Sequence, residues 1–387
     1  MQKKRVIYQV EGVYAGPTPA TGKHFESATY GVTPDDGTAY VGANLISGLF
    51  RVQSANYGFN IARTDVNQYG ELAAIDRIVL EQPTVNLELT YLLANVQNEK
   101  TLGLTITNDS IGPTSAIAGL LTKTTDEKNY FIVTAAEGND LVGESVTETY
   151  TNPVIGIGNA FFSSYQFQAS VGNFPTATVR LEALNIDFLG SGTGVPIPAV
   201  FPTDGTKVQG WWFRIPQLTE NPGGQTINQS NNSLSVLRPG DVNLFLDNFT
   251  NVEGGPDVTD LKVQSVTVGF DLNRESLQKL GSKYAYSKEP RFPVNATLSV
   301  NALIGDAVSG SLARAISANT TFNPYVNIYA PGTTTVVAGF GLRGAKLDSQ
   351  QYTSSIGPNK AVTLNFTSQV GGPQDTARGI FISGKYL

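Results

Sequence analysis

The sequence predicts a mainly β protein that contains two copies of one domain. Its 387 residues include 40 glycines and 20 prolines, spread along the chain among frequent Thr, Val, Asn and Ser. Long blocks of Ala, Leu, Glu and Lys are missing, and this composition is typical of many short strands joined by turns. A chain of this length is comfortable for two domains and too long for most single cores.

The clearest internal repeat is a strand. Residues 52–63 (VQSANYGFNIAR) align with residues 263–274 (VQSVTVGFDLNR) at a constant offset of 211, and six of the twelve positions are identical. The alternation of side chains along both segments is typical of a strand with one buried face.

The segment that follows each copy of this strand predicts a short helix. A polar start leads to apolar residues three apart and then to a glycine, in residues 64–70 and again in residues 275–281. This pattern is typical of one or two helical turns that end at a C-terminal glycine. We therefore expect helices at 64–69 and 275–280, with their apolar positions buried. The residues concerned are Val66, Tyr69 and Gly70 in the first copy, and Leu277, Leu280 and Gly281 in the second.

An arginine recurs where the repeated strand ends, as Arg63 and Arg274. Two interpretations are open. Each arginine forms a salt bridge to the neighbouring domain, with Asp65, Glu275 or a counterpart, or each caps its own domain locally. Together with the residues of the predicted helices and Pro293, these are the candidate assembly or domain-junction residues.

Each copy continues with a strand entered through a proline, Pro83 or Pro293, and these two strands match at an offset of 210. Proline is tolerated at the first residue of a strand. A glycine turn and a final strand then close each copy, at residues 169–181 and again at 354–366, with an offset of 185. The second copy is therefore shorter in its middle.

The order of these parts places a domain boundary in residues 190–196 (GSGTGVP), which have the composition of a linker. The predicted domains are residues 1–189 and 190–387. Long polar loops are expected at 15–37 and 219–232, and loops of this length are usually functional or mobile.

The charge and cysteine content of the chain narrow the range of functions that the sequence can support. Charged residues make up only 15% of the chain, against about 25% in an ordinary soluble domain, which suggests a surface covered in an assembly. The net charge of −6 argues against tight nucleic-acid binding and suits a surface past which DNA slides. Cysteine is absent, which fits assembly in a reducing cytoplasm. The N-terminal segment lacks the apolar run of a signal peptide, and we expect no membrane insertion.

No motif predicts an enzyme, a cofactor or a metal site. Residues 16–23 have five residues between the glycines where a phosphate-binding loop has four. Residues 339–344 (GFGLRG) have dinucleotide-motif spacing, but no helix is expected after them, so glycines of a strand or bulge are the favoured interpretation. His24 is the only histidine, which excludes a multi-histidine zinc site. A hydrolase with a carboxylate pair is not excluded, and Trp211 with Phe213 could form a sugar platform or pack in a core.

The repeated elements resemble one known family. The sequence VQS at 263–265, the alternating strand, Arg274, ESLQKLG at 275–281 and FPVN at 292–295 are similar to those of tail tube proteins of long-tailed bacteriophages. The similarity is to the branch whose subunit holds two tube domains. It covers most of the chain through the duplicated core and is weakest in the long loops.

The resemblance implies two tandem tail-tube-like β-sandwich domains, each with a short flanking α-helix. It also implies trimeric, pseudo-hexameric rings, which stack into a hollow tube whose inner wall is a continuous β-barrel. The expected partners are further copies of this chain, a tape-measure protein, and tail terminator or baseplate proteins, with phage DNA passing through without tight binding. The loops at 15–37 and 219–232 would contact neighbouring rings. The expected location is the virion tail, assembled in the host bacterial cytoplasm.

Two alternatives stay open. Another phage ring or decoration protein would use the same β architecture. A carbohydrate-binding adhesin or β-sandwich hydrolase would need clustered exposed aromatic residues, calcium ligands or a paired acid in a pocket. The duplication favours ring formation over both, because two similar surfaces in one chain suit a closed ring.

Overall fold

The computed structural model confirms a mainly β protein with few helices. The structure describes residues 11–18, 39–41, 46–80, 82–107, 112–135, 141, 149–150, 153–190, 192–193, 195–201, 204–207, 211–213, 240, 242–247, 261–304, 321–330, 336–353 and 361–384. Within these residues only two short helices occur, α2 (Gln97–Leu102) and α3 (Ala118–Leu121). Helix α2 ends at Gly103, whose φ of 103° is the left-handed conformation that a C-terminal glycine supplies.

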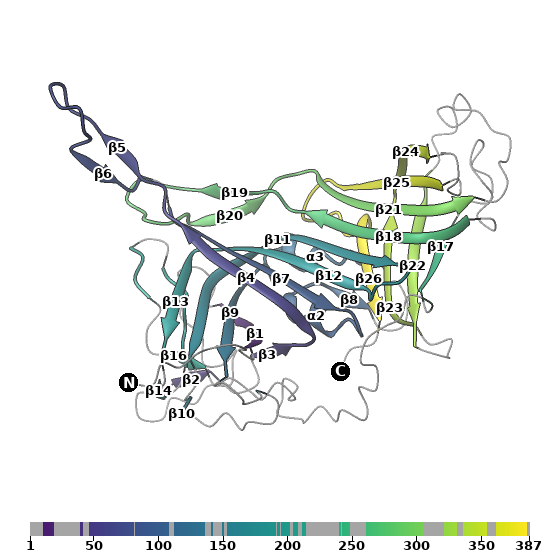
Figure 1. Ribbon diagram of the computed structural model, residues 1–387, viewed down its shortest axis with the longest axis horizontal. Coiled ribbons are helices and arrows are strands. Elements are labelled where there is room, and N and C mark those ends of the chain that lie inside the picture. Colours follow the sequence, from purple (N-terminus) through teal and green to yellow (C-terminus); the bar gives the residue numbers. More distant parts are fainter. Residues whose placement is uncertain are drawn as a thin grey trace.

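One long sheet crosses the whole molecule (Figure 1). Its main path runs in the order β4-β7-β12-β11-β18-β21-β25-β24, and every neighbouring pair is antiparallel. The strands are β4 (Val52–Asn60), β7 (Thr84–Leu92), β11 (Val154–Ser170), β12 (Thr176–Ala183), β18 (Leu261–Asp271), β21 (Val294–Ile304), β24 (Lys346–Thr353) and β25 (Ala361–Val370).

The sequence repeat is a repeat of strand order. The first half contributes β4-β7-β12-β11, and the second contributes β18-β21-β25-β24 in the same order. The halves join where β11 pairs with β18. The two predicted domains therefore contribute to one continuous sheet. The boundary near residue 190 itself stays a prediction.

Irregularities of the sheet also recur. Gln53 in β4 and Gln264 in β18 are extra residues between ladder pairs, and so are Ser163 in β11 and Asp348 in β24. Such β-bulges bend a strand at a defined position. The repeat therefore includes the bulges, at the sequence offsets of 211 and 185.

The proline alignment was wrong by one residue. In the sheet, Phe59 pairs with Val85, and its repeat counterpart Phe270 pairs with Ala296. The offset between β7 and β21 therefore stays at 211, because the buried face must continue across both halves. Pro83 and Pro293 both precede their strands, as predicted, but they are not structurally equivalent.

A second layer lies beneath each half of the long sheet (Figure 1). Under the first half it contains β1 (Glu11–Pro17), β3 (Ser47–Leu49), β9 (Glu127–Thr134), β13 (Asn185–Leu189) and the beginning of β11. Under the second half it contains β17 (Val242–Asp247), β22 (Asn323–Tyr329), β23 (Val336–Arg343), β26 (Gly379–Gly384) and β8 (Ile106–Thr107). Strand β11 passes between layers through Asn159, with φ of 51°, and Gly344 occupies the matching position after β23, with φ of 67°.

The glycines at 339 and 341 lie inside β23, which is followed directly by another strand, β24, as the strand interpretation predicted. The other described strands are short: β2 (Ala39–Val41), β10 (Thr149–Tyr150), β14 (Gly192–Thr193), β15 (Val195–Pro196) and β16 (Trp211–Phe213).

The hydrophobic core lies between the layers and is continuous across both halves. At the join, Phe167 of β11 stacks on Phe340 of β23 with ring centroids 4.2 Å apart, and Tyr165 stacks on Phe270 at 6.0 Å. A second cluster includes Val195 and Ile197, which pack with Tyr14 and Phe131 of the first half. Part of the predicted linker is thus buried, since Val195 is 1% exposed.

The two predicted helices are wrong. Both segments form β-hairpins, which we call the first arm (β5, Thr64–Val66, with β6, Asp76–Ile78) and the second arm (β19, Arg274–Leu277, with β20, Ser287–Pro290). Tyr69 and Leu280, expected to be buried, are fully exposed at the tips. Gly70 and Gly281 have positive φ in the turns of the tips and not after helices. The spacing of three reflected a turn between strands, with no core beside it to hold a helix.

The predicted loop at 219–232 and His24 lie outside the described residues, and so does most of the loop at 15–37, whose first residues belong to β1.

Candidate assembly interface

The joint between β11 and β18 is the template for the candidate interface. Seven residue pairs align along it, from Ser164 with Asp271 to Ser170 with Ser265. Phe167 pairs with Val268, and their side chains are buried beneath the sheet. In this joint the last strand of the first repeat, β11, pairs with the first strand of the second repeat, β18.

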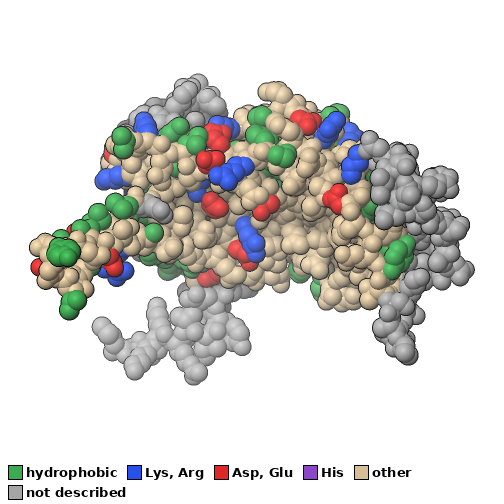
Figure 2. All heavy atoms as spheres, turned by 90° about the horizontal axis from the view of Figure 1, so that it is seen from above, with side chains coloured by type: hydrophobic (Ala, Val, Ile, Leu, Met, Phe, Trp, Pro, Cys, Tyr) green, Lys and Arg blue, Asp and Glu red, His purple; other side chains and the backbone are tan. Residues whose placement is uncertain are grey.

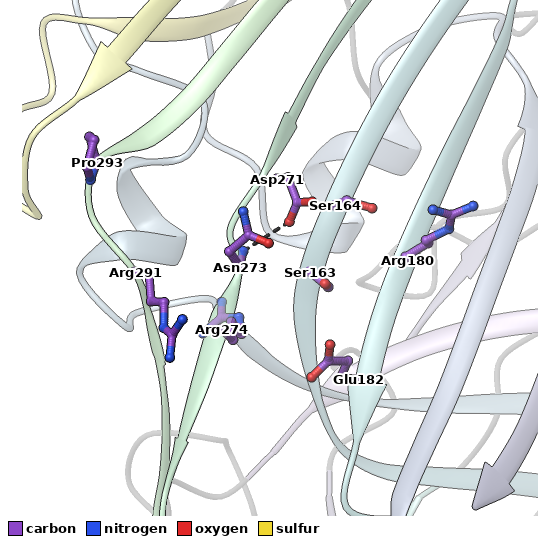
Figure 3. Close-up of a pocket in the computed structure, with 9 residues that line it drawn as sticks. All are labelled: Ser163, Ser164, Arg180, Glu182, Asp271, Asn273, Arg274, Arg291 and Pro293. Carbon is purple, nitrogen blue, oxygen red and sulfur yellow. Dashed lines mark hydrogen bonds between the residues drawn. The ribbon is translucent and has the colours of Figure 1, made fainter.

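At one end of the joint lies a polar pocket of about 530 Å³ (Figure 3). Its lining includes Ser163 from the β11 bulge, Asp271 and Arg274 from the second half, and Glu182 from β12. Asp271 accepts a hydrogen bond from the backbone N–H of Asn273 at 3.0 Å, which turns the chain from β18 into the second arm. The pocket thus marks where the arm leaves the sheet.

Arg274 fastens the second arm to the first half. Its guanidinium donates to the carbonyl of Phe162 at 2.6 Å and lies 3.4 Å from the carboxylate of Asp126. It also faces the ring of Phe161 at 5.5 Å. Burial lowers the pKa of Arg274, and the nearby carboxylate of Asp126 opposes this shift. Burial raises the pKa of Asp126, opposed by Arg274. The pair is therefore a nearly dry ion pair across the joint.

Lys288 of the second arm makes a second contact with the first half. Its side chain is 2% exposed and its Nζ lies 3.2 Å from Glu182. Burial lowers the pKa of Lys288, and Glu182 opposes the shift. Lys123 of the first half forms an ion pair with Glu289 at the edge of the same contact. The second arm is thus held against the first half by ion pairs between charged side chains of both halves.

The first arm has the same internal structure, but among the described residues no buried ion pairs of this kind fasten it to the body. Arg63 donates to the carbonyl of Arg77 at 3.5 Å, just as Arg274 donates to the carbonyl of Lys288 at 2.8 Å. The strand registers of the two arms also match at the offset of 211. The first arm nevertheless projects from the body with hydrophobic side chains at its end (Figure 2).

The remaining candidate residues lie on these arms or beside them. Asp65 forms an exposed ion pair with Arg77 at 2.6 Å, and Glu275 forms one with Arg291 at 3.2 Å. Exposed pairs of this kind contribute little stability. Leu277 is half-buried in β19, and Pro293 lines the pocket. Arg274 thus contacts the other half through Asp126 and not through Asp65 or Glu275.

The two outer strands of the long sheet are its exposed edges. Strands β4 and β24 each pair on one side only within the described part of the chain. Their counterparts β18 and β11 are paired on both sides. Phe59 of β4 is 57% exposed and Tyr352 of β24 is 49% exposed, whereas their counterparts Phe270 and Phe167 are buried.

Sequence reasoning missed Asp126, Phe161 and Asp348. Asp126 and Phe161 were missed because they lie outside the repeated motifs, so only the tertiary contact reveals them. For Asp348 the sequence does carry a signal, because the offset of 185 that relates the two final strands aligns it with Ser163.

Among the described residues no group of three His, Asp or Glu side chains is positioned to hold a metal ion. A search of the same residues for a helix long and apolar enough to cross a membrane finds none.

The chain matches no protein-family model, and a search of curated proteins finds no match. Among solved structures it is similar to a chain of the anti-feeding prophage baseplate, at 12% identity over 49% of this chain and 98% of that one, with a TM-score of 0.28. It is also similar to a chain of the native gene transfer agent virion, at 15% identity over 33% of this chain and 98% of that one, with a TM-score of 0.18. At these TM-scores neither similarity supports a conclusion about function.

Proposed function

We propose that this protein is a structural virion subunit that closes into rings by continuing its long sheet from copy to copy, and that the rings stack into a bacteriophage tail tube. The observation that carries the proposal is the match between the exposed edges and the internal joint. An exposed sheet edge invites pairing with another strand, and here both edges are repeats of strands that already pair with each other.

The internal joint predicts the register between copies. Phe167 pairs with Val268 and Gln168 pairs with Thr267 in the joint. Moving these pairs by 185 and 211 residues sets Tyr352 against Tyr57 of the next copy, and Thr353 against Asn56. The exposed aromatic side chains of both edge strands would then be buried, which supplies a driving force for association.

In a heterologous contact of this kind, one edge of a subunit pairs with the opposite edge of the next. Such contacts generate a closed ring when the rotation that relates neighbouring subunits adds up to a full turn. A ring of three copies would hold six similar half-sheets, as the resemblance to two-domain tail tube subunits implies. The subunit then has no enzymatic role and needs no cofactor. Its partners are further copies of itself, a tape-measure protein and tail terminator or baseplate proteins, and DNA passes without tight binding. We place it in the virion tail, with assembly in the bacterial cytoplasm.

Disulfide trapping tests the register directly. The chain has no cysteine, so the double variant Asn56→Cys with Thr353→Cys contains the only two thiols, both at exposed positions. The two sites lie on opposite edges of one chain's sheet, which places them about 30 Å apart across the strands. Facing residues of an antiparallel pair are close enough for a disulfide, so oxidation should give covalent chains of two and three subunits.

The matched control is Asn56→Cys with Lys346→Cys, because residue 346 lies about 23 Å further along β24. Negative-stain electron microscopy and size-exclusion chromatography of the unmodified protein complete the test. Hollow tubes of uniform width with trapping at 56 and 353 support the proposal. Rings without trapping contradict the register, and single rings that never stack favour a different ring or decoration protein. A monomer that is never trapped contradicts the assembly.

A further inference from the structure

Within the described part of the chain, Arg63 of the first arm has no carboxylate partner like the one that Asp126 provides for Arg274, and the repeat indicates a partner in the next copy. We infer that Arg63 of one copy forms an ion pair with Asp348 of the next copy, and that this pair anchors the first arm on the second half of its neighbour. The inference rests on the proposed ring, and the binding partner of the first arm is a second copy of this chain.

The bulges place the two residues together. Ser163, at the bulge of β11, and Arg274 line the same pocket at the internal joint (Figure 3). The bulge carbonyl of Ser163 also accepts the N–H of Leu272 at 2.8 Å, which holds the root of the second arm. Asp348 is the bulge residue of β24, and Arg63 is the repeat counterpart of Arg274. A joint between copies therefore brings an aspartate to the place where the internal joint has a serine.

Charge complementarity supports the same assignment. At the internal joint the buried Arg274 is balanced by Asp126 and, at longer range, by Glu182 and Glu289. The counterpart of Glu182 in the second half is Thr367, which carries no charge. A guanidinium buried without a carboxylate would be costly. In the joint between copies, Asp348 would supply a negative charge near the position where the internal joint has Glu182 and the second half has the uncharged Thr367.

The charges of the first arm support the same assignment. Arg77 of the first arm stands at the position of Lys288. Arg77 already engages Asp65 at 2.6 Å, so Asp65 does not balance Arg63 in the joint between copies. Asp348 is the exposed acidic side chain that the repeat places beside Arg63.

A charge swap tests the pair. Arg63→Glu and Asp348→Arg should each raise the protein concentration needed for ring formation by about tenfold or more, because each single change sets like charges together. The double variant should return this concentration to within about threefold of the unmodified protein. Both sites are exposed in the single chain, so circular dichroism of the soluble subunit should not change.

Trapping at residues 56 and 353 separates this inference from the ring itself. Suppose that the cysteines at 56 and 353 are trapped when Arg63 and Asp348 are unmodified, and that each single charge variant weakens assembly. If the double charge variant then does not recover assembly, the Arg63–Asp348 pair is wrong while the ring stands. If the single variants assemble as well as the unmodified protein, the pair is also wrong. If trapping fails in the unmodified background, the register between copies and this inference are both overturned.

Discussion

Arg274 and Asp126 lie 3.4 Å apart across the joint between the two halves, with side chains 0% and 8% exposed. Arg63 occupies the same place in the first copy of the repeat and is exposed. The local sequence around the two arginines is similar, and the hydrogen bond to the opposite strand of the arm is kept. The difference between them comes from the neighbour that each arm meets.

This difference predicts unequal effects of the same substitution. Arg274→Ala leaves Asp126 buried without its partner and should lower the free energy of unfolding by about 3–5 kcal/mol. Arg63→Ala should change the stability of the soluble subunit by about 0.5 kcal/mol at most, because the site is exposed. Urea unfolding of both variants at neutral pH measures the difference. Equal effects would show that Arg274 does not join the halves.

A buried carboxyl group makes stability depend on pH. Glu99 of α2 accepts hydrogen bonds from the hydroxyls of Tyr91 at 2.8 Å and Tyr165 at 3.0 Å. Burial raises the pKa of Glu99 from 4.5 to about 7, although both hydroxyls oppose the shift. Between these values the unfolded chain releases the proton and the folded protein keeps it. Stability is therefore highest below the unfolded pKa and falls as pH rises through the folded pKa.

Glu99→Gln should remove this dependence, since the amide oxygen still accepts both hydroxyls and does not titrate. The difference in unfolding free energy between the unmodified protein and the variant should change by about 3 kcal/mol between pH 4.5 and about pH 8. Denaturant midpoints across this range give the comparison, with Glu275→Gln, at an exposed position of the second arm, as the control. A constant difference across the range would mean that Glu99 is not the titrating group.

The aromatic stack under the joint should dominate the stability of the shared core. Phe340 is fully buried and lies parallel to Phe167, with an interplanar angle of 7°. Phe340→Ala should lower the free energy of unfolding by about 3–5 kcal/mol through lost burial and the cavity left behind. Phe59→Ala, at the exposed edge, is the matched control and should cost about 0.5 kcal/mol or less in the soluble subunit. Guanidinium unfolding gives both values, and a small effect of Phe340→Ala would refute a core shared by the halves.

The long loop at 219–232 remains a predicted contact between stacked rings. Its deletion should leave the circular dichroism spectrum unchanged and allow ring formation while preventing stacking. Electron microscopy distinguishes single rings from tubes. Undisturbed tubes, or an unfolded product, would count against a stacking role for this loop.

The sequence predicted well wherever the repeat and the alternation of side chains agreed. The strands around residues 52–60 and 261–271, and the closing strand at 361–370, were all anticipated because one buried face needs a period of two. The helices at 64–69 and 275–280 were wrong, because spacing over seven residues cannot distinguish a helical turn from a hairpin tip. The proline alignment was wrong by one residue, because the register of the buried face, and not the position of the proline, sets the offset between the two strands.

The sequence by itself determined that the protein is mainly β, that its strand pattern occurs twice, and that both copies carry an arginine where the repeated strand ends. Only the tertiary structure decided that β11 meets β18, that Arg274 reaches Asp126, and that β4 and β24 are left as edges. The physical reason is that hydrophobic periodicity is a local property of the chain. Strand partners and ion pairs across 148 residues depend on how the layers pack.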